Sequence, residues 1–155
     1  MASIIKQFYR TKSKTDEIKI FIEKHLTLSK QTVYKGEKAV EKEIVKQLRQ
    51  EFEGDDIASQ FAVGGFLGLK CDIDICNGQC GVELKVAKQL NNATALQRVI
   101  GQVFYYSQRR YKDTGLILLV VGTQEKLDPK FKELKDFVEQ IQGVHFMYKQ
   151  ADMKK

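Results

Sequence analysis

Three side chains suited to acid–base or metal-ion chemistry lie within one short stretch, residues 69–86: Asp72, Glu83 and Lys85. An Asn-Gly pair at 77–78 stands between two runs that alternate apolar and polar residues, which predicts a β-hairpin with a tight turn. With the turn at 77–78, Asp72 pairs with Glu83. Because side chains alternate between the faces of a strand, we expect both carboxylates and Lys85 on one face.

Two carboxylates paired in this way favour a cation between them. Opposed side chains lie ~4.5–5.5 Å apart at Cβ, where like charges repel unless a cation intervenes or one group is protonated. Mg²⁺ accepts one or two carboxylates together with water and phosphate oxygens, and the carbonyl of Leu84 is a further candidate ligand. Lys85 can hold a phosphate oxygen, orient an attacking water or neutralise developing charge. The alternative is a solvated polar face that binds nothing.

A second aspartate makes the ligand assignment ambiguous. Asp74 shares the face of Asp72 and lies opposite Gly81, which leaves space beside it. The expected register favours Asp72 as the principal ligand, with Asp74 as a candidate for a second ion or a water. A different turn type would change which aspartate lies beside Glu83.

Hydrophobic periodicity assigns the elements that would position these groups. The other face of the hairpin is apolar and should pack on a helix: Cys71, Ile73, Ile75, Val82, Leu84 and Val86. Helices are expected over 15–28, 37–52, 94–111, opened by a capping-box pattern at Thr94, and 128–142, with Pro129 at its first position. Strands are expected over 57–63, in the hairpin, over 116–121 and over 144–148, with a break at 29–36. This order predicts an α/β fold with a mixed sheet and helices on its faces.

Composition narrows the class of protein. The chain has 155 residues, the size of one domain, and 43% hydrophobic residues, which is usual for a globular protein. No apolar stretch approaches the ~20 residues of a membrane span, and no secretion signal is recognised, so we expect a cytoplasmic (intracellular) protein and no membrane partner. The three cysteines lack a standard zinc spacing. The net charge is +6, and residues 1–35 supply eight Lys or Arg against three acids, which suits a polyanionic partner or a solvated face.

The pattern Asp72 … Glu83-Leu84-Lys85, with apolar neighbours, resembles the PD-(D/E)xK nuclease superfamily, although Cys71 stands where a proline is usual. The segment 34–45 is similar to the N-terminal helix of archaeal Holliday-junction resolvases. That resemblance implies that Glu41 is a metal ligand, with Glu37 one turn earlier in reserve.

The expected helix over 94–111 fits the same resemblance. Many members of the superfamily carry a Gln-x-x-x-Tyr pair there, matched by Gln102 and Tyr106 on one helical face. Arg98 and Arg109 lie close to that face, which suits phosphate binding and makes these four the candidate nucleic-acid contacts. The stripe opposes an apolar one formed by Val99, Ile100, Val103 and Phe104.

The resemblance covers about residues 35–122 and implies a restriction-endonuclease-like mixed β-sheet with helices on both faces. The chain then divides into a basic helical extension (1–34), a catalytic core (35–122) and a closing helix and strand (123–155), all in one nuclease domain. The implied activity is hydrolysis of phosphodiester bonds in DNA with Mg²⁺, for which Mn²⁺ would substitute. The alternatives are an RNA-directed nuclease, a non-catalytic nucleic-acid-binding module on the same fold, or a scaffold protein. A homodimer would place two sites on two strands.

Overall fold

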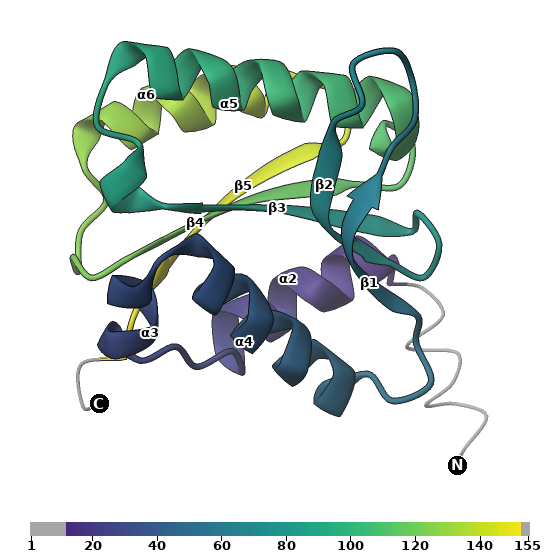
Figure 1. The fold of residues 1–155 in the computed structure, drawn as a ribbon, viewed down its shortest axis with the longest axis horizontal. Coiled ribbons are helices and arrows are strands. Elements are labelled where there is room, and N and C mark those ends of the chain that lie inside the picture. Colours follow the sequence, from purple (N-terminus) through teal and green to yellow (C-terminus); the bar gives the residue numbers. More distant parts are fainter. Residues whose placement is uncertain (1–11, 153–155) are drawn as a thin grey trace.

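A five-stranded mixed sheet lies at the centre of the computed structural model, which describes residues 12–152 (Figure 1). Its strands are β1 (Ile57–Ala62), β2 (Lys70–Ile75), β3 (Cys80–Val86), β4 (Leu116–Gly122) and β5 (Val144–Gln150), in that spatial order. The pairs β1–β2 and β2–β3 are antiparallel, whereas β3–β4 and β4–β5 are parallel. The predicted α/β class with a mixed sheet is therefore confirmed.

Helices cover both faces of this sheet (Figure 1). They are α2 (Lys14–Lys24), α3 (Lys30–Lys35), α4 (Glu37–Glu51), α5 (Ala93–Tyr106) and α6 (Pro129–Val138), with a 3-10 turn η1 (Ala87–Gln89) and a π-helical turn η2 (Ser107–Tyr111) that continues α5. α2, α3 and α4 lie on one face, and α5 and α6 lie on the other. No helix within residues 12–152 is long and apolar enough to cross a membrane.

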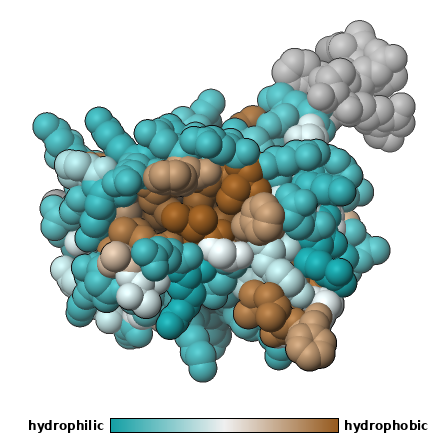
Figure 2. Space-filling model, turned by 90° about the horizontal axis from the view of Figure 1, so that it is seen from above, coloured by the Kyte–Doolittle hydropathy of each residue, from teal (hydrophilic) through white to brown (hydrophobic). Residues whose placement is uncertain are grey.

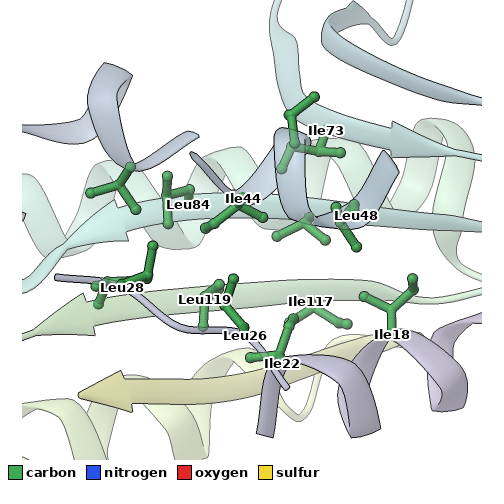
Figure 3. Close-up of a cluster of buried hydrophobic side chains, with 14 of the residues drawn as sticks. Ile18, Ile22, Leu26, Leu28, Ile44, Leu48, Ile73, Leu84, Ile117 and Leu119 are labelled. Atoms are coloured by element: carbon green, nitrogen blue, oxygen red, sulfur yellow. The ribbon is translucent and has the colours of Figure 1, made fainter. Parts of the chain in front are cut away.

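The core on the α2–α4 face follows from helical spacing. Ile18 and Ile22 recur along α2, and Ile44 and Leu48 recur along α4, so each helix has one apolar stripe. These side chains interleave with Leu84, Ile117 and Leu119 of the sheet (Figure 3). The apolar side of β3 is held against α4, which brings the first turns of that helix to the end of the strand.

The core on the α5–α6 face holds α5 in place. Val99, Val103 and Tyr106 of α5 are buried with Leu118 and Val120 of β4. Every residue of β4 is buried, as expected for a continuous apolar run in the middle of a sheet. Phe104, predicted to face this core, is instead 54% exposed, because the buried stripe of α5 is narrower than the sequence pattern indicated.

Several predicted boundaries shift for local reasons. The predicted break at 29–36 contains the short helix α3, which is capped by the Ser29 side chain. α5 is capped by Asn92, whose side chain accepts a hydrogen bond from the Ala95 N–H, and not by Thr94. The last predicted helix has Pro129 at its start, as expected, but ends at Val138. Of the predicted extension 1–34, residues 1–11 lie outside the described part of the chain.

The β1–β2 ribbon rises out of the plane of the other strands toward α5 (Figure 1). Cys71 consequently belongs to the core cluster beneath α5, together with Tyr106, and not to the cluster containing Ile73, as the alternation had predicted. Gln60 lies beside this bend with a φ of 52°, which is uncommon for a residue other than glycine.

Candidate active site

The hairpin has the register that the sequence predicts. Ile73 pairs with Val82 and Asp74 with Gly81, although the connection is a four-residue turn over 76–79, in which Asn77 has a positive φ. One step further along the same register, the backbone N–H of Asp72 donates to a Glu83 carboxylate oxygen over 3.3 Å. The two acids therefore lie side by side where β2 and β3 begin to separate.

Within residues 12–152, Asp72 accepts hydrogen bonds from neutral donors only. Its carboxylate accepts a hydrogen bond from the Leu84 N–H at 2.8 Å and another from the Gln60 side-chain amide at 3.0 Å. The same amide nitrogen of Gln60 donates to Glu41 at 2.6 Å. Gln60 thus joins a carboxylate from α4 to a carboxylate from β2, and Asp72 is 7% exposed.

Lys85 carries the positive charge of the cluster. Its ammonium lies 3.2 Å from the Glu83 carboxylate and 3.8 Å from that of Glu37 on α4. Glu37, the reserve candidate from the sequence, therefore contacts the lysine, whereas Glu41 contacts the Asp72 side through Gln60. Within the described residues, Lys85 is thus shared by the carboxylates of Glu37 and Glu83, and the charge of Asp72 also acts on it.

Burial and neighbouring carboxylates raise the pKa values of two acids of the cluster. Burial, and then the charge of Asp72, raises the pKa of Glu83 to about 8. Burial raises the pKa of Glu41 to about 7; the hydrogen bond from Gln60 opposes this rise, and the charge of Asp72 adds to it. Burial lowers the pKa of Lys85, but the surrounding carboxylates raise it further, to above its usual value. An added cation would relieve this repulsion.

Two candidate nucleic-acid contacts line a shallow cavity beside Lys85. This cavity, of about 240 Å³, includes Glu37, Arg98 and Gln102. The side-chain oxygen of Gln102 is buried and has no hydrogen-bond partner within the described chain, which indicates a place for a donor from a ligand or water. A larger hollow of about 900 Å³ reaches Glu41 and is lined by basic side chains of α3 and α4: Lys35, Lys42, Lys46 and Arg49.

The structure places the other two candidate contacts elsewhere. Tyr106 is buried, and its hydroxyl donates to the Lys70 carbonyl at 2.8 Å, so it fixes β2 and cannot contact a nucleic acid at the surface. Tyr106 follows Val99 and Val103 at helical spacing, so the face that α5 turns to the sheet includes it. Arg109 is exposed but lies against Gly64 and Gly65, at the β1–β2 loop.

Asp74 does not join the cluster, although it shares a face with Asp72. Its carboxylate accepts hydrogen bonds from Arg110 at 2.8 and 3.1 Å, from the Tyr111 hydroxyl at 2.5 Å and from the Gly78 N–H at 3.2 Å. Asp74 is the predicted candidate for a second ion, but the guanidinium of Arg110 already neutralises its charge. The Leu84 N–H holds Asp72, while the role of its carbonyl as a ligand stays a prediction.

A cation site is not preformed in the described chain. Within residues 12–152, no three carboxylate, imidazole or thiol groups are already spaced to hold a metal ion. The physical reason is that Gln60 stands between Glu41 and Asp72, while Glu83 turns toward Lys85. The donor set nonetheless suits a hard cation, because it consists of carboxylate oxygens that repel one another.

Gln60 and Arg110 are the contacts that sequence reasoning missed. Gln60 had a usable signal: folding the strand 57–63 back on the hairpin about the glycine turn places it opposite Asp72, as the observed β1–β2 register requires. Arg110 had none, because its approach to Asp74 depends on the π-helical end of α5.

No family model matches this chain, and no curated protein or solved structure matches it either.

Proposed function

We propose that the protein is a metal-dependent nuclease of the PD-(D/E)xK type, with a restriction-endonuclease-like fold, that hydrolyses phosphodiester bonds of DNA. The observation that carries this proposal is one contact network. It joins Glu41 of α4, Asp72 of β2, and Glu83 and Lys85 of β3. These residues come from three separate segments, and the sequence pattern had selected the same four.

Glu41, Asp72 and Glu83 are the residues that would hold Mg²⁺ or Mn²⁺. They offer the oxygen ligands that such ions bind, and burial together with the charge of Asp72 raises the pKa values of Glu41 and Glu83, an effect that a bound cation would oppose. A bound Mg²⁺ would supply polarisation of the phosphoryl oxygen and a lowered pKa for an attacking water.

The protein side chains have separable tasks in this proposal. Lys85 orients the water or meets the charge that develops on the phosphate, and Glu83 and Glu37 hold its ammonium in place. The Leu84 N–H fixes the orientation of the Asp72 carboxylate. Arg98 and Gln102, in the cavity beside Lys85, would contact the bound strand.

A polyanionic substrate suits the surroundings of the site. Basic side chains line the hollow near Glu41, and the chain has a net charge of +6. Contacts from lysine and arginine to phosphates supply most sequence-independent affinity for nucleic acids. A homodimer that presents two such sites to two strands is part of this proposal.

The first experiment measures cleavage of supercoiled plasmid, linear duplex, single-stranded DNA and RNA with Mg²⁺ or Mn²⁺. We expect cleavage with metal and none with EDTA or in Lys85→Ala. Lys88→Ala is the matched control, because it removes the same charge from an exposed position just after β3. Cleavage of RNA alone would favour an RNA-directed enzyme. Binding without cleavage by wild type in either metal would establish a non-catalytic nucleic-acid-binding module instead.

A further inference from the structure

The loop between β1 and β2 carries two large apolar side chains into solvent. Phe66 is fully exposed and Leu67 is 64% exposed. Figure 2, seen from the α5–α6 side, shows a smaller apolar group that projects from the surface, apart from the larger apolar hollow between hydrophilic ridges. An exposed phenylalanine lacks the favourable free energy that burial of its ring would provide. A partner that covers the ring would supply it.

The loop is held in a defined position. The Val63 N–H donates to the Leu69 carbonyl at 3.3 Å, which closes the base of the loop. On its α5 side, the Tyr105 hydroxyl donates to the Gly64 carbonyl at 2.8 Å. Gly64, Gly65 and Gly68 all have positive φ, a conformation that presents the tip outward and that other residues rarely adopt.

The loop leads directly into β2, the strand that carries Asp72 to the site. Leu69, at the base of the loop, is three residues before Asp72, or ~10 Å along the strand. A nucleic-acid strand advances ~3.4 Å per nucleotide, so the tip lies about three nucleotides or more from a phosphate bound beside Asp72. One bound strand can therefore reach both places.

The charges around the tip select a polyanionic partner. Residues 57–71, from β1 through the loop to the start of β2, contain Lys70 and no aspartate or glutamate; α5 and η2 (93–111) contain Arg98, Arg109 and Arg110 and no acid, and Arg110 is paired with Asp74 of β2. Lys70 and Arg109 are exposed at the base of the loop, and Arg109 lies against Gly64 and Gly65. An apolar tip flanked by cations suits a nucleobase face with phosphates on either side.

We infer that Phe66 and Leu67 form a wedge that contacts unstacked nucleobases, so that the substrate is a nucleic acid with unpaired bases. This inference rests on the proposed nuclease function and adds its substrate class. Phe66 stacks on a base, Leu67 fills the gap beside it, and Lys70 and Arg109 contact the flanking phosphates. In an intact duplex the wedge would first have to unstack the bases, so duplex binding gains less from this contact.

The test compares affinities in EDTA, where no cleavage occurs. Fluorescence anisotropy is measured with a labelled duplex, the same duplex with a short unpaired bubble, and its single strand. We expect wild type to prefer the bubble and the single strand. Phe66→Ala should bind these two about five- to a hundredfold more weakly, as expected for the loss of one base–aromatic stack, whereas Phe66→Trp should retain the preference. Phe137→Ala is the matched control, because Phe137 is an exposed phenylalanine on α6.

A second measurement uses the fluorescence of one base to report on its contact with the protein. A 2-aminopurine in the bubble should change its fluorescence on adding wild type or Phe66→Trp, and should respond much less to Phe66→Ala. Equal affinity for paired and unpaired DNA in wild type would overturn the inference, and so would a dimer that dissociates on Phe66→Ala, since the tip would then be an interface between copies. A preference for unpaired bases, without cleavage in Mg²⁺, would instead refute only the nuclease proposal.

Discussion

Asp72 and Asp74 are two residues apart on one face of one strand, yet their environments are opposite. Asp74 accepts hydrogen bonds from Arg110, Tyr111 and the Gly78 N–H, so its charge is matched. Asp72 receives neutral donors from Gln60 and Leu84 and has Glu83 as its neighbour. The comparison teaches that one aspartate has a cation of its own and stabilises the fold, whereas the other shares its surroundings with further carboxylates, which is the feature on which the proposed metal site rests.

The residue opposite each aspartate produces this difference. Gly81 lies opposite Asp74, and a Cβ there would come within 2.6 Å of the Tyr111 ring. The missing side chain lets Tyr111 and Arg110 close over Asp74. Glu83 stands at the corresponding place beside Asp72 and brings a second negative charge in place of an aromatic lid.

The largest expected effect comes from Asp72→Asn. This change removes a ligand charge from the proposed metal site, so cleavage should fall at least about a hundredfold. The unfolding temperature should change little without metal, because Asp72 has no cation to lose. Cleavage assays and thermal unfolding with and without Mg²⁺ check both, and wild type alone should be stabilised by the ion. Full cleavage by Asp72→Asn would refute the assignment.

Asp74→Asn is the same chemical change with the opposite expected result. It weakens charged hydrogen bonds to Arg110 and Tyr111, which costs about 2 kcal/mol of unfolding free energy and lowers the unfolding temperature by about 4–8 °C. Cleavage measured below that temperature should persist. Arg110→Ala should destabilise similarly and Arg109→Ala should not. If Asp74→Asn is folded and inactive, Asp74 belongs to the active site and the contrast fails.

The raised pKa values predict how stability depends on pH. In the metal-free protein, Glu83 has a pKa of about 8 and Glu41 of about 7, against an ordinary 4.5. The folded state therefore binds more protons than the unfolded state between pH 4.5 and about 8, so these groups make the unfolding free energy fall as pH rises through that window. Denaturation in EDTA should show a shallower fall for Glu83→Gln than for wild type. Parallel curves would show that Glu83 ionises normally.

The smallest expected effect concerns Gln60. Its amide donates to both Glu41 and Asp72, so a Mg²⁺ ion bound as proposed would displace it or turn it to present its oxygen. Gln60→Ala removes the donor, which should destabilise the metal-free protein slightly and enlarge the stabilisation gained from Mg²⁺. Thermal unfolding across a Mg²⁺ titration measures this difference. Gln47→Ala is a control, because the side chain of Gln47 bonds the backbone of Thr27 and neither acid of the site. An unchanged metal response would exclude Gln60 from the site.

Local pattern was sufficient for most of the fold and half of the site. The Asn-Gly turn and the alternation of β2 and β3 determined that Asp72, Glu83 and Lys85 share a face, because a period of two is a property of any strand. The apolar run of β4 and the stripes of α2 and α4 likewise determined which residues are buried. These inferences need no contact beyond a few neighbouring residues.

Long-range packing decided the rest. Whether an acid keeps its charge unmatched depends on residues from distant segments, as Arg110 at Asp74 and Gln60 at Asp72 show. Tyr106 was expected at the surface and Phe104 in the core, but Tyr106 is buried and Phe104 is exposed. The rotation of α5 on the sheet, and not helical period alone, selects the buried stripe. The bend of the β1–β2 ribbon moved Cys71 to the other core. The sequence by itself determined which groups could meet, and tertiary structure decided which charges are neutralised, because neutralisation requires partners that no local spacing specifies.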